Sequence, residues 1–170
     1  DTRAETIRGL EHQLDLDTLE RRVRRRPRDD AALAPIERDY RAAVAREAES
    51  PLACLAALEA ILAIHGGDHP PAGGDQRLWL ALVRRQIARV APLAAREREE
   101  DLSRAAATLA EARTLAAQAE VAASPEQTDL LARRRALLEG LVEIYATRPH
   151  ATEAVAEARG LLEAAADAQP

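Results

Sequence analysis

Apolar residues recur at helical spacing along nearly the whole chain, and no stretch alternates apolar and polar residues for long enough to indicate a strand. Glycine, proline and serine-proline signals divide this pattern into helical segments. The expected segments are 2–26, 31–49, 52–65, 75–121, 126–146 and 151–167. The pattern therefore predicts an all-α fold of about six helices, joined mostly by short turns into an up-and-down or helical-hairpin bundle.

The apolar pattern of the first segment changes phase partway along. Its apolar residues form two successive stripes, Ile7, Leu10 and Leu14 and then Leu16, Leu19 and Val23. Residues in one stripe are three or four apart, as on one helix face, but the step from the first stripe to the second is only two. This slip predicts a kink or a break between Asp15 and Asp17.

Two serine-proline pairs mark helix starts. Serine caps the free amides of a helix, and proline accepts the first helical position without losing a bond. Ser50-Pro51 should therefore begin the third segment. Ser124-Pro125, with Gln127 three residues after the serine, reads as a capping box. It should turn the chain sharply, so that the segments on either side form an antiparallel hairpin.

The fourth segment carries apolar residues at alternating spacings of three and four, the pattern of a heptad seam. Pro92 interrupts the seam and predicts a bend, after which leucine and alanine resume it. We expect the seam to form a protein interface. The single tryptophan is a candidate anchor, since tryptophan is enriched at binding hot spots, but a core position is the favoured interpretation of it. The residues assigned to the contact are Trp79, Leu80, Val83, Ile87, Val90, Leu102 and Leu109.

The last pair of segments offers a comparison with the tetratricopeptide repeat. Four of its residues, Leu138, Leu141, Tyr145 and Ala154, fall at the spacings of that repeat. Val142 replaces the glycine of the repeat, and no earlier segment matches at its period of about 34 residues. A tetratricopeptide-type solenoid is therefore the alternative arrangement, and no family is assigned.

Composition predicts a thin core. The chain is 47% hydrophobic and 31% charged, a globular balance, but 40 of its 170 residues are alanine. Burial stabilises by roughly 25 cal/mol per Å² of apolar area, so an alanine contributes far less than a leucine. An elongated bundle, or one that buries surface against a partner, fits this composition better than a compact sphere.

The choice of amino-acid types indicates the base composition of the genome and the origin of the chain. All 24 basic residues are arginine, and lysine, asparagine, phenylalanine and methionine are absent, as expected for a GC-rich bacterial gene. Because the chain lacks methionine and begins at Asp1, we expect a piece of a longer protein. Residues 1–170 should form one helical domain, with N-terminal helices at 1–49, a glycine- and proline-rich loop at 66–75 and helical hairpins at 76–170.

The loop at 66–75 contains the most conspicuous polar cluster. His65, Asp68 and His69 carry two imidazoles and a carboxylate, which are zinc ligands. They are candidates for a metal site, but no further ligand is identifiable. In the competing interpretation, His65 lies at a helix C-terminus, where it favours the dipole, and the following glycines form a left-handed cap.

A run of arginines ends the first segment and is a candidate contact for anions. Its members are Arg21, Arg22, Arg24, Arg25, Arg26 and Arg28. Phosphates of a nucleic acid or lipid would suit such a run. However, residues 1–30 hold eight arginines and eight acidic residues, so a salt-bridged protein face is favoured over an anionic-polymer site.

Other function classes receive little support. No window has the roughly 18 apolar residues of a membrane helix, and a net charge of −5 gives no general attraction to nucleic acid. The single cysteine, Cys54, excludes an internal disulfide and fits a helix interior. His12 lacks the neighbours of a phosphoacceptor, and no nucleophile or nucleotide motif is present. Neither catalysis nor a cofactor is predicted.

We therefore expect a non-catalytic helical module for protein-protein interaction or oligomerisation in a larger bacterial protein, such as a scaffold. The partner is a protein, a second copy included, and contact with a membrane would require segments outside these residues. The first alternative is a sensory or ligand-binding bundle of a receptor or transporter, with the loop at 66–75 as its lid. The second is binding of an anionic polymer. A cytoplasmic location of the protein is favoured over an extracytoplasmic one.

Overall fold

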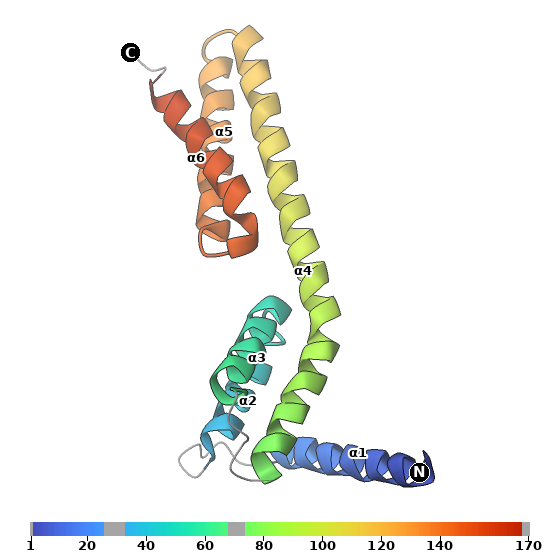
Figure 1. The fold of residues 1–170 in the computed structure, drawn as a ribbon. Coiled ribbons are helices and arrows are strands. Elements are labelled where there is room, and N and C mark those ends of the chain that lie inside the picture. Colours follow the sequence, from blue (N-terminus) through green and yellow to red (C-terminus); the bar gives the residue numbers. More distant parts are fainter. Residues whose placement is uncertain (1, 26–32, 68–73, 168–170) are drawn as a thin grey trace. The chain divides into compact units, whose positions relative to one another are not determined.

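The all-α prediction is confirmed by a computed structural model that describes residues 2–25, 33–67 and 74–167 (Figure 1). Within these ranges there are six α-helices, one short 3-10 helix and no strand. The helices are α1 (Thr2–Arg25), α2 (Pro35–Ala45), α3 (Pro51–His65), α4 (Gly74–Val121), α5 (Glu126–Tyr145), η2 (Pro149–Ala151) and α6 (Thr152–Asp167). None of the helices described has an apolar run long enough to cross a membrane.

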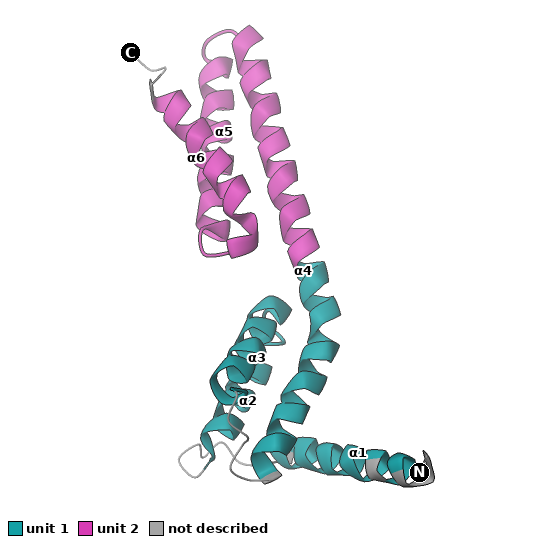
Figure 2. Cartoon of the chain, viewed as in Figure 1, with its two compact units in different colours: residues 1–97 teal, residues 98–170 magenta. Residues whose placement is uncertain are grey.

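The chain divides into two compact units, residues 1–97 and 98–170 (Figure 2). The first contains α1, α2, α3 and the first half of α4. The second contains the remainder of α4 with α5, η2 and α6. Each unit gathers its own buried apolar cluster, whereas composition predicts a single domain.

The core of the first unit combines residues from all four of its helices. Tyr40 and Trp79 are the aromatic centre, with ring centroids 5.7 Å apart and planes tilted by 58°. Tilted aromatic pairs at this separation add stabilisation beyond the burial of area. The fully or almost fully buried aliphatic residues around this pair are Leu58, Ile61, Leu82, Val83 and Val90.

The core of the second unit is built where alanines allow helices to approach closely. Ala105 and Ala112 of α4 and Ala158 of α6 are at most 1% exposed. The larger buried residues around them are Leu109, Leu138, Leu141, Tyr145 and Val155. The predicted hairpin of α4 and α5 is present, with the two helices antiparallel across residues 122–125 (Figure 1).

The two serine-proline pairs behave differently. Ser50 Oγ accepts a hydrogen bond from Ala53 N at 3.1 Å, and Pro51 is the first residue of α3, which confirms the predicted cap. The capping box at Ser124 is wrong, because α5 follows Pro125 with no side-chain cap. Backbone carbonyls already accept from the first amides there: Gln127 N donates to Ala123 O at 3.1 Å, and Thr128 N to Pro125 O at 3.0 Å.

Other helix ends differ in detail from the prediction. The second helix begins at Pro35, later than expected, because Ala34 takes the extended conformation (φ −59°, ψ 145°) that a following proline favours. It ends at Ala45, and residues 46–49 form turns. Gly66 has φ −97° and is not a left-handed cap. A Cβ there would lie 2.4 Å from Leu62 O, which explains the glycine.

Candidate interaction surface

The first helix is continuous across the predicted break. Residues 2–25 form one helix, so the predicted break near Asp15 to Asp17 is wrong. A helix turns by about 100° per residue, and the step of two from Leu14 to Leu16 therefore moves the apolar stripe about 200° around the axis. The phase slip marks a change of face, with no break in the backbone.

The two faces of α1 have opposite environments. Leu16 and Leu19 are 8% and 7% exposed and belong to the core of the first unit. Ile7, Leu10 and Leu14 are 49%, 59% and 62% exposed. Because the second stripe faces the core, the first faces away from it. The N-terminal half of α1 therefore presents an exposed apolar face, called here the α1 stripe and defined by Ile7, Leu10 and Leu14.

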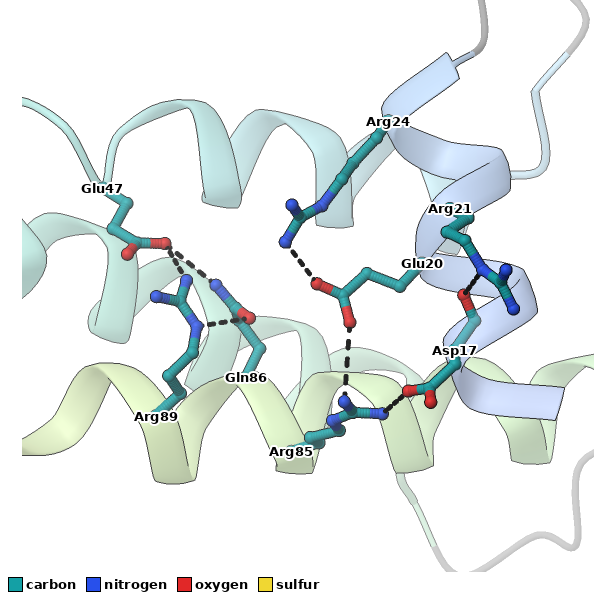
Figure 3. Close-up of polar contacts among 8 residues, drawn as sticks. All are labelled: Asp17, Glu20, Arg21, Arg24, Glu47, Arg85, Gln86 and Arg89. Carbon is teal, nitrogen blue, oxygen red and sulfur yellow. Dashed lines mark hydrogen bonds and ion pairs between the residues drawn. The ribbon is translucent and has the colours of Figure 1, made fainter. Parts of the chain in front are cut away.

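Beside its buried face, α1 is connected to α4 by a polar network (Figure 3). Arg85 of α4 donates to Asp17 Oδ1 at 2.5 Å and lies 3.9 Å from Glu20 Oε2. Glu20 also accepts from Arg24 at 2.6 Å. These contacts join the C-terminal half of α1 to the core, and the α1 stripe lies beyond them toward the N-terminus.

The same face of α4 also binds the turn after α2 (Figure 3). Glu47 accepts hydrogen bonds from Gln86, at 2.9 Å, and from Arg89. The hydrogen bond to Glu47 is the largest cause that raises the pKa of the Arg89 guanidinium above its usual range. Gln86 is only 5% exposed, so this contact anchors the helix pair α2–α3 to α4.

The seam residues assigned to a protein interface lie in the core of the chain itself. Trp79, Leu80, Val83 and Val90 are at most 5% exposed, and Ile87 is half-buried against the same cluster. This corrects their assignment, because α1, α2 and α3 already cover the seam and a partner cannot reach it in the folded unit.

The two seam leucines of the second unit differ in their exposure to solvent. Leu109 is 6% exposed and packs in the core of that unit, which also corrects its assignment to a partner contact. Leu102 is 39% exposed and is the most exposed of the assigned seam residues.

The arginine run is largely neutralised where the structure describes its side chains. Arg22 lies 3.3 Å from Glu37 Oε2, and Arg24 pairs with Glu20. Arg21 Nε donates to the backbone oxygen of Asp17 at 3.2 Å (Figure 3). The side chains of Arg25, Arg26 and Arg28 lie outside the described residues. A salt-bridged face explains the described arginines better than an anion site.

The predicted histidine cluster is only partly covered by the described residues. His65 Nε2 lies 3.2 Å from Asp39 Oδ2, a partner on α2 that the sequence does not suggest. Asp68 and His69 lie outside the described residues, as does most of the loop at 66–75. Among residues 2–25, 33–67 and 74–167, no three histidine, cysteine or acidic side chains are grouped as metal ligands would be. His12 is exposed on α1.

The second unit contains a buried carboxylate that no sequence pattern indicates. Asp101 of α4 is 3% exposed and accepts from Arg148 and, at 3.0 Å, from His150 Nε2. Arg148 also stacks on the Tyr145 ring, 5.6 Å from its centroid. Asp101 appears in the sequence as the last member of an acidic run, where a solvent-exposed helix face is the usual interpretation. Its role here is to hold the turn before α6.

The second unit also has an apolar groove between α5 and α6, with a volume of about 540 Å³. Its apolar lining is Leu131, Ala132, Leu138, Leu162, Ala165 and Ala166. Arg134, Arg135 and Glu139 provide its charged side chains. No local sequence motif predicts the groove, because it depends on how two helices diverge.

Comparison with known proteins identifies no relative. No protein-family model matches the sequence, and no curated protein or solved structure is significantly similar to it. A functional argument therefore depends on the residues and surfaces described above.

Proposed function

We propose that this chain is a non-catalytic helical module that associates with other copies of itself. The observation that carries the proposal is the α1 stripe, three aliphatic side chains about half exposed on one helix face. Apolar residues at this spacing are typical of a helix that packs in the groove of a partner. Burying them against protein would add roughly 25 cal/mol per Å² of apolar area.

The polar network of α1 supports this proposal. Asp17 and Glu20 of α1 pair with Arg85 of α4, which connects the C-terminal half of the helix to its own unit and sets the direction in which the N-terminal half projects. A helix end held from one side pays less ordering entropy when it binds than a disordered segment does. The α1 stripe is in this sense a preorganised binding element.

Light scattering coupled to size exclusion tests the proposal across a wide concentration range. The wild-type chain should exceed the 18.5 kDa of a single copy as concentration rises. Leu10→Glu should return it to one copy, because a carboxylate in the stripe must be desolvated on association. Gln13→Glu is the matched control, an exposed position of the same helix that gains the same charge outside the stripe.

Helical circular dichroism must show both variants folded. A wild-type chain that keeps the mass of one copy at every concentration would contradict the proposal. So would equal association of the Leu10→Glu variant and the wild type, since the stripe would then not be the contact.

A further inference from the structure

The groove of the second unit opens because short side chains fail to fill it. Near η2, α5 and α6 are tightly packed through Tyr145, Ala151 and Val155, all buried. Toward its C-terminus α6 continues with the three alanines 164–166, and the two helices diverge (Figure 1). Leu131 is 38% exposed, and Leu162 and Ala165 are half-buried. This end of the helix pair therefore presents apolar surface.

The groove carries positive charge that its own residues satisfy poorly. Arg134 Nη2 reaches Leu161 O only at 3.5 Å, the limit of a hydrogen bond. Arg135 pairs with Glu139 at 2.8 Å, but these side chains are 73% and 52% exposed, and such pairs contribute little. An acidic helix could therefore approach without breaking a strong contact.

The N-terminal half of α1 has the complementary properties. Its stripe follows the spacing i, i+3, i+7 that helix-in-groove recognition uses. Glu11 and Asp15, exposed and four residues apart, follow one edge of the stripe and provide negative charge. At about 1.5 Å per residue the stripe spans about 10 Å, and the groove wall from Thr128 to Glu139 spans about 16 Å.

We propose that the groove between α5 and α6 receives the α1 stripe of a second copy, with Glu11 and Asp15 facing the arginines of α5. This inference rests on the proposed function and identifies the receiving surface. The contact joins two different surfaces, so it is heterologous, and repetition of it produces rings or open chains. A dimer made through two α1 stripes would instead be symmetric and closed.

A mixing experiment separates these arrangements. Leu10→Glu damages the stripe and keeps the groove, whereas Ala166→Glu blocks the groove and keeps the stripe. Ala166 is exposed, so its substitution leaves the core of the second unit intact. Each variant alone should keep the mass of one copy. An equimolar mixture should give a complex of twice 18.5 kDa, since one intact stripe meets one intact groove.

The control for the groove variant is Ala164→Glu, an exposed alanine on the same helix that does not line the groove. It should associate as the wild type does. Circular dichroism with thermal unfolding checks that each variant is folded.

Three outcomes would overturn the inference and are distinguishable from one another. If the wild type associates and Ala166→Glu associates equally, the stripe binds elsewhere, for example to a second stripe, and only the groove assignment fails. If the wild type keeps the mass of one copy throughout, the proposed function fails as well. Absence of a complex in the mixture, with both variants folded, would also exclude the heterologous contact.

Discussion

Buried charged residues each connect two helices in this chain. Glu37 of α2, 1% exposed, accepts from Arg41 of its own helix and from Arg22 of α1, both at 3.3 Å. Asp101 of α4 does the same for the turn before α6 through Arg148 and His150. A buried carboxylate is costly without partners, so each of these residues selects the helix arrangement that supplies them.

Asp101→Asn should lower the free energy of unfolding by about 2 kcal/mol, because hydrogen bonds to charged groups contribute about 1.5–3 kcal/mol. Urea unfolding followed by circular dichroism measures the change. The neighbouring Glu100→Gln is the control: its pair with Arg104 is 64% and 67% exposed, and we expect a loss below about 0.5 kcal/mol. Equal losses for the two variants would show that burial of Asp101 is unimportant.

The raised pKa of the buried Tyr40 phenol predicts that the folded chain loses stability at alkaline pH. Burial is the largest cause, followed by the charge of Glu20, and together they raise the pKa of the Tyr40 phenol from 10.0 to about 12. Between these values the folded chain keeps a proton that the unfolded chain has lost. Stability from this group is therefore complete below pH 10.0 and falls as pH rises toward about 12.

Phenolate absorbance of the Tyr145→Phe variant, in which Tyr40 is the only tyrosine, measures this pKa directly. Ionisation should follow a midpoint near pH 12 while helical circular dichroism is intact. Ionisation of the folded variant near pH 10 would contradict the argument. Burial also raises the pKa of the Cys54 thiol, so the same titration can be repeated with Cys54→Ala to remove that group.

At the scale of helices, the local sequence does not decide how an end is capped. Ser50 and Ser124 each precede a proline, yet only Ser50 caps its helix. Glu97 of α4 explains part of the difference, since its carboxylate accepts from Ser50 Oγ and from Leu52 N, both at 2.8 Å. The start of α3 is thereby tied to α4.

Ser50→Ala should reduce the free energy of unfolding by about 1–2 kcal/mol, the usual contribution of a helix cap. Ser124→Ala is the matched control in the same sequence setting, and it should change stability by less than about 0.5 kcal/mol. Thermal and urea unfolding of both variants give the comparison. A comparable loss of unfolding free energy in Ser124→Ala would mean that the Ser124 hydroxyl stabilises the chain although it makes no cap bond.

Because the apolar stripe of α1 changes face, the leucines of this helix should contribute unequally to stability. Leu19→Ala should cost about 2–4 kcal/mol, because it removes a buried side chain from the first core. Leu10→Ala should cost less than about 0.5 kcal/mol when measured at a concentration where the chain is a single copy. Similar losses at the two positions would indicate that the N-terminal half of α1 packs on its own unit.

At the scale of the whole molecule, two separate cores predict unfolding that is not one cooperative transition. Trp79 is the only tryptophan and lies in the first core, so its fluorescence reports that unit alone. Leu141→Ala in the second core should lower the midpoint of part of the helical signal and leave the midpoint of Trp79 fluorescence in place. Coincident shifts of both signals would show that α4 couples the two units.

The sequence predicts the helices well because their signals are local. Periodicity, prolines and the Ser50 cap lie within a few residues of the structure they specify, and the six predicted segments correspond to the six helices described. The candidate surface, the α1 stripe, could be predicted from the sequence only in part. The phase slip between Leu14 and Leu16 is present in the sequence, but it has two interpretations, a broken helix or a helix with two apolar faces.

The all-α class, the approximate helix limits and the positions that carry apolar stripes follow from the sequence alone. Which of these stripes are covered depends on the packing of the helices. The heptad seam around Val83 is buried by α1, α2 and α3, the α1 stripe is exposed, and the alanines 164–166 leave a groove open. The physical reason is that periodicity fixes the face a residue occupies, whereas burial depends on which distant helix, if any, packs against that face.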